Sequence, residues 1–223
     1  MRFVDEVVGR FAAASNLTLL GRSGGEAVIY KPVAGNRPLW DFDVATLAAR
    51  EVLTFEVAVA MGLDVVPETV LGDGPLGPGA VQRFVEEDHD ADPLESVRRC
   101  DPRLWAIAVL DLVVNNADRK AGHLLTERAT GRILAIDHGL TFHPDDKVRT
   151  VLWCFAGRPI PEALVASLEA LERAAAGGLA HRVARHLGED AAAALSARVA
   201  ALLDDPVHPE PPDHRPPVPW PPV

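Results

Sequence analysis

Long hydrophobic runs are missing from this sequence of 223 residues. No uninterrupted apolar stretch approaches the ~20 residues that a membrane-spanning helix needs. The first residues also lack the apolar core of a signal peptide. We therefore expect no transmembrane segment and a cytoplasmic location. The hydrophobic content of 48% is nevertheless high enough to build a core, which excludes a wholly disordered chain.

Cysteine and basic residues are also scarce. The two cysteines, Cys100 and Cys154, stand in no CxxC or cysteine–histidine spacing, so we predict that both are reduced and structural, with one disulfide as the alternative. Lysine and arginine number 22 against 32 acidic residues, which gives a net charge of -10. That balance argues against nucleic acid as a partner and against docking on an anionic membrane, because both need an excess of basic side chains.

The hydrophobic pattern predicts an α+β fold in two parts. Apolar positions on one face predict a helix over residues 1–15. The other expected helices span 44–61, 103–115, 162–176, 179–186 and 191–203, and the expected strands span 17–20, 27–30, 65–71, 80–85, 124–126 and 132–136. We predict an N-lobe over 1–86 and a C-lobe over 87–205. The proline-rich residues 206–223 are expected to form an extended, mobile tail.

Two aspartates stand in polar turns beside apolar runs. Asp118 follows the apolar run 105–114, and Asp137 lies between the short run 133–136 and Gly139. A carboxylate at the first place can orient a hydroxyl nucleophile and accept its proton. A carboxylate at the second place can bind Mg²⁺, which prefers oxygen ligands. Taken singly, each aspartate is equally well a residue that stabilises its turn.

A lysine, Lys31, ends an apolar strand just after a glycine-rich turn. Such a lysine can reach nucleotide phosphates while a glutamate on a helix holds its ammonium group. Glu51 and Glu56 on the following helix are the candidates, and we prefer Glu51. Ser23 and Gly24 in the turn are further candidate nucleotide contacts. The turn matches neither a Walker loop nor a GxGxxG motif, and a lone strand-end lysine can simply extend to solvent.

Six segments in the first two thirds of the chain share an order with a known family. They are Val28-Ile-Tyr-Lys-Pro32, Arg50-Glu51, Val66-Pro67-Glu-Thr69, Val81-Gln-Arg-Phe-Val-Glu86, Val109-Leu-Asp-Leu-Val-Val-Asn-Asn-Ala-Asp-Arg119 and Ala135-Ile-Asp-His-Gly-Leu-Thr-Phe142. In this order they resemble the phosphatidylinositol 3-/4-kinase superfamily, especially the type II phosphatidylinositol 4-kinase branch and a small actinobacterial PI3/PI4-kinase-like family. The resemblance implies a two-lobed protein-kinase-like fold, with an antiparallel sheet and one main helix in the N-lobe and a mainly helical C-lobe.

The resemblance also implies how a nucleotide is bound. Lys31 would bind the phosphates of ATP, and Glu51 would be its ion-pair partner. Gln82 would begin the hinge between the lobes, and the backbone groups of Phe84 and Val85 would read adenine.

The catalytic residues follow from the same resemblance. Asp118 would be the catalytic aspartate, Arg119 would hold its loop, and Asp137 would bind the metal ion. The family usually has an asparagine five residues after the catalytic aspartate as a second metal ligand, and here that position is His123. A histidine nitrogen suits Mn²⁺ better than Mg²⁺. The expected cofactors are therefore ATP with Mg²⁺ or Mn²⁺.

These expectations combine into one function and two alternatives. The expected function is ATP-dependent transfer of phosphate to a hydroxyl of an unknown acceptor. A protein or small molecule is favoured over a lipid, because the chain is acidic and lacks basic loops that would face a membrane. The first alternative, motivated by His123, is a nucleotide-binding pseudokinase that serves as an interaction module. The second is a nucleotidyl transferase on the same fold.

Overall fold

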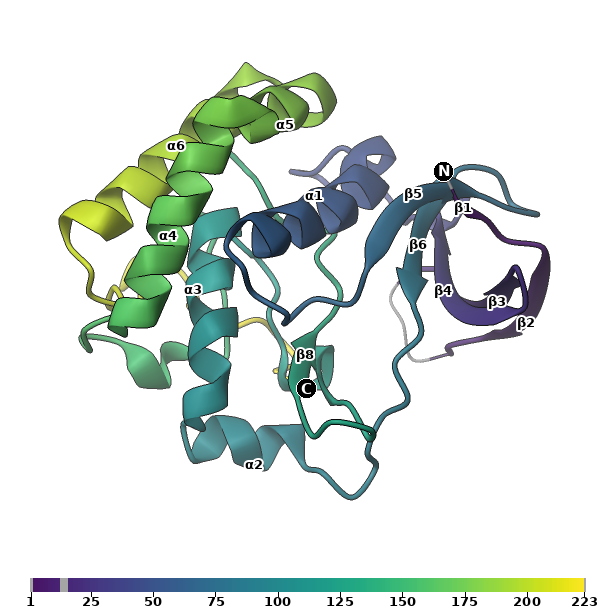
Figure 1. The fold of residues 1–223 in the computed structure, drawn as a ribbon, viewed down its shortest axis with the longest axis horizontal. Helices are drawn as coiled ribbons and strands as arrows, with labels where there is room; N and C mark the ends of the chain where they lie inside the picture. The colour runs from purple at the N-terminus through teal and green to yellow at the C-terminus, as the bar shows by residue number, and fades with distance from the viewer. Residues whose placement is uncertain (1, 13–15, 223) are drawn as a thin grey trace.

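The first part of the chain is a six-stranded sheet. The structure is a computed structural model that describes residues 2–12 and 16–222. The strands are β1 (Arg2–Phe3), β2 (Glu6–Arg10), β3 (Leu19–Ser23), β4 (Glu26–Pro32), β5 (Thr69–Asp73) and β6 (Gly79–Arg83). They lie in the order β1-β5-β6-β4-β3-β2, and only the β1–β5 pair is parallel. Figure 1 shows the sheet curling strongly at its β2–β3 end.

The β3–β4 hairpin was expected from the sequence and is present. Its turn contains Gly24 and Gly25, which both have positive φ. Along β4 the side chains alternate, so that Val28 and Tyr30 are buried inside the curled sheet. Lys31 lies on the other face of the strand, toward the rest of the molecule. A side chain at Gly79 on β6 would collide with the Lys31 carbonyl group, which explains the glycine beside this lysine.

The helix predicted over residues 1–15 is wrong. β1 and β2 occupy this region, and residues 1 and 13–15 lie outside the described residues. β2 pairs with β3, with a register shift between Val7 and Gly9. That shift breaks the strict alternation of a strand, so the spacing of the apolar residues imitates a helix. Pairing with β3 satisfies the backbone here, although Phe3 and Val8 stay exposed.

One long helix packs against this sheet. α1 (Leu47–Ala60) contacts β5 and β6 on one side and α3 and α4 on the other. It begins after a short 3₁₀ turn, Val44–Thr46, in which the Asp43 side chain accepts a hydrogen bond from the Ala45 N–H. Two charged residues of α1, Arg50 and Glu51, are buried with its apolar face. The helix expected over 44–61 is therefore present and brings Glu51 under the sheet.

The second part is mainly helical. Its helices are α2 (Pro93–Arg98), α3 (Trp105–Val114), α4 (Glu162–Ala174), α5 (Ala180–Leu187) and α6 (Glu189–Asp204), and β7 (Leu124–Thr126) pairs with β8 (Ile133–Ala135). All but α2 were expected. Asp92 caps α2 ahead of a proline at its first position, a recognisable start signal for a helix. The largest apolar core lies between α1, α3, α4, α5 and α6.

The proline-rich tail was expected to be extended and mobile, but it is docked on the C-terminal part. Proline lacks an N–H donor yet keeps its carbonyl acceptor. Pro206, Pro217 and Pro222 each use this carbonyl to accept hydrogen bonds from the rest of the chain, at 2.7 to 3.0 Å. The tail thereby runs from the end of α6 to the neighbourhood of β8, where the chain ends in Figure 1. Its Trp220 side chain points to solvent.

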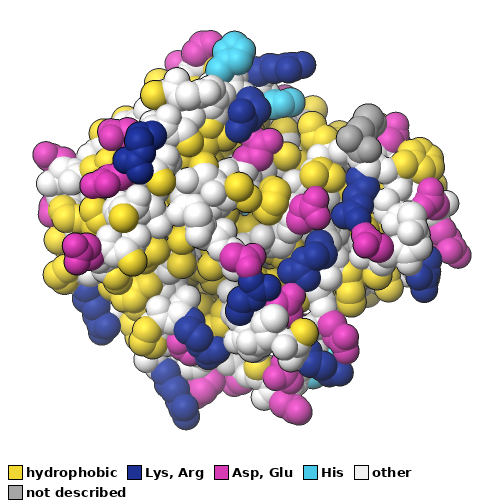
Figure 2. Space-filling model, in the orientation of Figure 1, with side chains coloured by type: hydrophobic (Ala, Val, Ile, Leu, Met, Phe, Trp, Pro, Cys, Tyr) yellow, Lys and Arg dark blue, Asp and Glu magenta, His cyan; other side chains and the backbone are white. Residues whose placement is uncertain are grey.

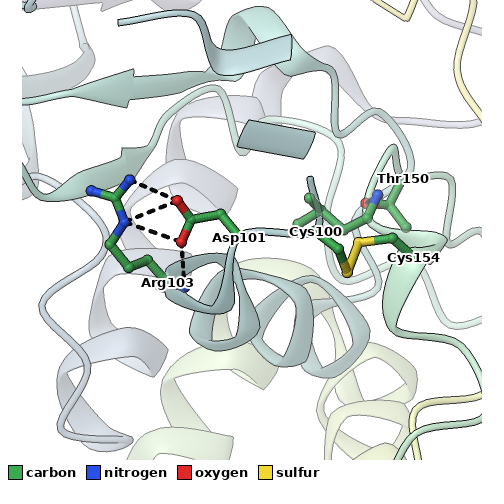
Figure 3. The surroundings of a disulfide bond; sticks show 6 residues. Cys100, Asp101, Arg103, Thr150 and Cys154 are labelled. Atoms are coloured by element: carbon green, nitrogen blue, oxygen red, sulfur yellow. Dashed lines mark hydrogen bonds and ion pairs between the residues drawn. A yellow bond between two sulfur atoms is a disulfide. The ribbon is translucent and has the colours of Figure 1, made fainter. Parts of the chain in front are cut away.

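The two cysteines form a disulfide, which corrects the expectation that both are reduced. Cys100 follows α2 and Cys154 lies in the segment after the second aspartate turn, and their Cα atoms are 5.8 Å apart (Figure 3). The two residues are 54 positions apart in the sequence, so only the fold brings them together. Disulfides are rare in cytosolic proteins, and the cytoplasmic location stays a prediction.

The surface carries both acidic and basic side chains. Figure 2 shows acidic and basic side chains interspersed over one face, with apolar groups between them. Within residues 2–12 and 16–222, each helix is too short or too polar to cross a membrane.

Candidate active site

A three-residue charge cluster connects the sheet to the helical part. Lys31 Nζ on β4 contacts Glu51 Oε1 on α1 and lies 3.3 Å from Asp137 Oδ1, in the turn after β8. Burial alone would lower the pKa of Lys31, but the charges of Asp137 and Glu51 outweigh it and raise this pKa. In return, Lys31 lowers the pKa of Asp137. We call the space between β4, α1 and the Asp137 turn the cleft.

The turn that carries Asp137 is held in an uncommon backbone conformation. Asp137 has a φ of 61°, in the left-handed region that aspartate tolerates better than most residues. Its Oδ2 atom lies 3.4 Å from His123 Nε2. Burial lowers the pKa of His123 to about 4, so the imidazole is neutral at pH 7. The structure therefore brings Asp137 and His123 together on the side of the cleft opposite the sheet.

Arg119 lies beneath the cleft rather than in it. The side chain is fully buried, and its guanidinium group donates hydrogen bonds to both carboxylate oxygens of Asp111 on α3, the shortest at 2.9 Å. It also donates to the Ile136 carbonyl oxygen at 2.8 Å and lies 2.8 Å from His138 Nε2. One guanidinium group thus ties α3, the Asp118 loop and the Asp137 turn into one rigid unit. This geometry gives Arg119 a positioning role.

Asp118 is presented from the loop that Arg119 holds. Its backbone N–H donates to the Asn116 side chain at 3.0 Å, and its Oδ2 atom lies 3.2 Å from Lys120 Nζ. Burial raises the pKa of Asp118, and the Lys120 charge opposes this effect. A half-buried carboxylate with a neighbouring cation can orient a hydroxyl group and accept its proton.

The residues expected at the hinge have different surroundings. The Gln82 side chain is buried and donates to Thr69 Oγ1 at 2.9 Å, so it supports the sheet, and it does not line the cavity beside Lys31. Phe84 and Val85 follow the end of β6. Within the part of the chain that the structure describes, their backbone groups form no hydrogen bond to other backbone groups. They are therefore available to a ligand, as adenine recognition would require.

Ser23 and Gly24 lie apart from the charge cluster. Ser23 is the buried last residue of β3, and the Gly24 N–H already donates to Asp5 Oδ2 at 2.7 Å. A cavity of about 50 Å³ lies beside Lys31, Glu51 and Asp137, and neither residue lines it. Its wall instead includes three polar residues that the sequence did not single out, Asn16, Thr18 and Asn36.

Two buried partners of the site were also missed. Asp111 stands alone as a charge in the apolar run of α3, and His138 follows Asp137 directly. A single carboxylate in an otherwise apolar helix is a usable signal, because such a group is rarely buried without a partner. The residues Asn16, Thr18 and Asn36 gave no comparable signal, since isolated Asn and Thr are common in loops.

The donor atoms of the cleft fit a metal ion only in part. Among residues 2–12 and 16–222, no three carboxylate, imidazole or thiol groups are placed to enclose a metal ion. Asp137 and His123 offer one oxygen and one nitrogen side by side. Mg²⁺ is commonly held by one or two carboxylates together with phosphate oxygens and water. A metal ion in the cleft would therefore depend on a bound nucleotide to complete its coordination.

No protein-family model matches this sequence. A protein of Mycobacterium tuberculosis (strain ATCC 25618 / H37Rv), Protein Rv2133c, is 38% identical to it over 254 residues, which cover 96% of this chain and 91% of that protein. The chain belongs to the Rv2133c family. The family name describes no activity, so membership alone assigns none.

Solved structures show the fold of this member of the Rv2133c family. The Helicobacter pylori proinflammatory kinase CtkA has a TM-score of 0.60 at 13% identity, over 92% of this chain and 95% of that chain. The open conformation of CtTel1 has a TM-score of 0.45 over 84% of this chain and 11% of that chain, which is too low to support a conclusion. The fold is thus the two-lobed kinase-like α+β fold that the PI3/PI4-kinase resemblance implied. The narrower likeness to type II phosphatidylinositol 4-kinases has no support in these comparisons.

Proposed function

We propose that this protein is an ATP-dependent phosphotransferase that transfers phosphate to a hydroxyl group of an acceptor. The observation that carries the proposal is the position of Lys31, whose ammonium group contacts Glu51 and Asp137 from three separate elements. An ammonium group paired with a helix glutamate, beside a metal-binding aspartate, is a recurring way to hold nucleotide phosphates. The kinase-like fold supports the same reading.

The proposed roles follow the geometry of the cleft. Lys31 binds the ATP phosphates, and the free backbone groups of Phe84 and Val85 hold adenine. Asp118 orients the acceptor hydroxyl and takes its proton as that oxygen forms a bond to the γ-phosphorus of ATP, while the bond from this phosphorus to the bridging oxygen breaks and ADP leaves. A Mg²⁺ or Mn²⁺ ion, held by Asp137 and His123, would neutralise charge on the phosphates. The net charge of -10 favours a protein or small-molecule acceptor over a lipid.

One observation favours a second candidate, a nucleotide-binding pseudokinase. His123 lies next to Asp137, at the position of a second metal ligand, and its nitrogen is a poor ligand for Mg²⁺. The substitution His123→Asn separates the two functions. A large gain in Mg²⁺-dependent turnover would indicate a site that has lost activity, whereas a loss would show that histidine is the working ligand.

A thermal-shift titration with ATP, in Mg²⁺ and then in Mn²⁺, tests nucleotide binding independently of turnover. A ligand that binds only the folded state at one hundred times its Kd stabilises that state by about 2.7 kcal/mol. We expect stabilisation in wild type, its loss in Asp137→Asn, and no loss in Asp145→Asn, a solvent-exposed control. Absence of stabilisation by any nucleotide would overturn the proposal.

Turnover is tested with Asp118→Asn. We expect ATP to stabilise this variant as it does wild type, while phosphate transfer falls by about 10² to 10⁴, the usual contribution of a general base. Unchanged transfer would remove Asp118 from the mechanism. The mass of the product distinguishes transfer of one phosphate from transfer of a nucleotidyl group.

A further inference from the structure

A second cavity, much larger than the one in the cleft, lies at the other side of the C-terminal part. Its volume is about 820 Å³, and it is bounded by α6, the segment 144–153 and the tail residues 205–215. Binding sites for small organic molecules commonly measure about 300 to 1,000 Å³. We call this cavity the C-terminal groove.

The walls of the C-terminal groove are mostly apolar. Leu112, Val148 and Leu202 are buried side chains that line it, and Trp153 and Val207 are half-buried beside them. These residues come from α3, from the segment after the Asp137 turn, from α6 and from the tail. A ligand with an apolar body would therefore contact four separate parts of the chain.

A single cation in this groove lacks a counter-ion. Arg198 of α6 donates from Nε to the Val113 carbonyl oxygen at 2.8 Å, near the end of α3, but its Nη2 atom is shielded from solvent without a hydrogen-bond partner. Among the described residues, Arg198 forms no ion pair with a carboxylate, whereas Arg215 is paired with Asp146 at 2.8 Å. Burial lowers the pKa of Arg198 to about 10, against the effect of Asp146. A partly buried guanidinium group without a counter-ion favours an anionic ligand.

A buried histidine adds a second polar requirement. His208 is 1% exposed and packs against the rings of Trp105 and Trp153. Its Nδ1 atom lies 3.0 Å from the Pro209 carbonyl oxygen, which can only accept, so Nδ1 carries the hydrogen. Nε2 is then an acceptor that no group in the described chain satisfies. A ligand N–H or O–H group would satisfy it.

We propose that the C-terminal groove binds a small organic acid that has an apolar body and a single carboxylate, which pairs with Arg198. The carboxylates of Asp205 and Glu210 at the exposed rim disfavour ligands of higher negative charge. This proposal does not depend on the proposed function, since the groove shares no residue with the cleft.

Calorimetric titration with a matched pair of probes tests the proposal. The probes are 4-phenylbutyrate and its methyl ester, which share an apolar body, carry no hydrogen-bond donor and differ in charge. We expect wild type to bind the carboxylate at least tenfold more tightly than the ester. In Arg198→Met this ratio should fall to about one, because the variant keeps the apolar contacts and removes the cation. Arg173→Met, on the exposed face of α4, is the matched control and should keep the wild-type ratio.

A second variant tests where the probes bind. It leaves intact the hydrogen bond from Arg198 Nε to the Val113 carbonyl oxygen near the end of α3. Ala201 is exposed on α6 and lines the groove, so Ala201→Trp should fill the space and abolish binding of both probes. Equal affinities of the two probes for wild type, an unchanged ratio in Arg198→Met, or unchanged binding in Ala201→Trp would each overturn the proposal. So would the absence of binding by both probes.

Discussion

The cleft and the C-terminal groove both contain buried polar side-chain atoms that lack hydrogen-bond partners. Six buried side-chain atoms in the described part of the chain lack a hydrogen-bond partner. Three belong to the cleft, on Glu51, His123 and His138, and three belong to the groove, on Arg198, His208 and Arg215. Because buried polar atoms are almost always paired, such clusters mark places where water, an ion or a ligand completes the structure.

The two regions differ in what surrounds these atoms. In the cleft the neighbours are charged, Lys31 bridges two carboxylates, and the cavity measures only about 50 Å³. In the groove the neighbours are apolar and the cavity measures about 820 Å³. A charged ligand would have to replace ion pairs in the cleft and separate its two sides. The groove is already open to an apolar ligand, and one arginine is left to fix its orientation.

The largest expected effect is on the rigid unit beneath the cleft. Asp111→Ala leaves Arg119 buried without its carboxylate, and breaking a buried ion pair in this way costs about 3–5 kcal/mol. Urea unfolding should report this loss in the free energy of unfolding. The double variant Asp111→Leu with Arg119→Met removes both charges and should recover much of the stability while activity stays absent. Equal losses in the single and double variants would contradict this account.

The disulfide should contribute nearly as much. It closes a loop across 54 positions. In the chain-entropy model, a loop of this length lowers the entropy of the unfolded chain and so stabilises the folded state by about 4 kcal/mol. The bond joins the end of α2 to the segment that contains Thr150 (Figure 3), and Thr150 forms a β-bridge with Arg119 of the Asp118 loop. Chemical denaturation with and without a thiol reductant should show the loss in wild type, and the variant Cys100→Ser with Cys154→Ser should be insensitive to the reductant. A reductant-insensitive wild type would show that the bond does not form.

Truncating the tail should lower the free energy of unfolding by a smaller amount, and it should affect both the cleft and the C-terminal groove. Residues 216–222 accept three hydrogen bonds, from the backbone N–H groups of Thr150 and Ala121 and from the Trp153 side chain. At about 1 kcal/mol each, their loss on truncation after Arg215 should lower the free energy of unfolding by roughly 3 kcal/mol. Because Ala121 is three residues after Asp118, phosphate transfer should fall as well. The control Trp220→Ala, which changes an exposed side chain, should match wild type in urea unfolding.

The sequence was informative where the chemistry is local. The helix that carries Glu51, the strand that carries Lys31 and the hairpin before Asp137 all follow from the apolar period, turn residues and helix starts. The pairing of Lys31 with Glu51 was expected from the strand-end lysine and the helix that follows it. The contact of Lys31 with Asp137 joins residues 106 positions apart and was not predicted. Local patterns carry no information on such separations.

The sequence failed where tertiary contacts override local preference. The tail was judged by its prolines, but its carbonyl groups are acceptors whose donors lie elsewhere in the chain. The strand β2 was mistaken for a helix because its register shift hides the alternation of its apolar residues. The C-terminal groove could not be foreseen, since it is formed by four segments that only the fold assembles.

The smallest expected effect is a pH dependence that belongs to the groove. Burial lowers the pKa of His208, whose neighbours include Glu210, Asp111 and the rings packed on it. The folded state therefore binds a proton less readily than the unfolded state, in which histidine has a pKa of about 6.5. The stabilisation by neutral His208 is complete above that pH and is lost as the pH falls below it.

Urea unfolding at pH 7.5 and at pH 5.5 tests this. The difference between the two free energies of unfolding should be smaller in His208→Gln than in wild type, whereas the exposed His181→Gln should keep the wild-type difference. Because His123 in the cleft has a depressed pKa as well, His208→Gln should keep a residual pH dependence to which the cleft contributes. An identical pH dependence in wild type and His208→Gln would show that the imidazole of the groove is solvated, and the comparison between the two regions would then rest on the cleft alone.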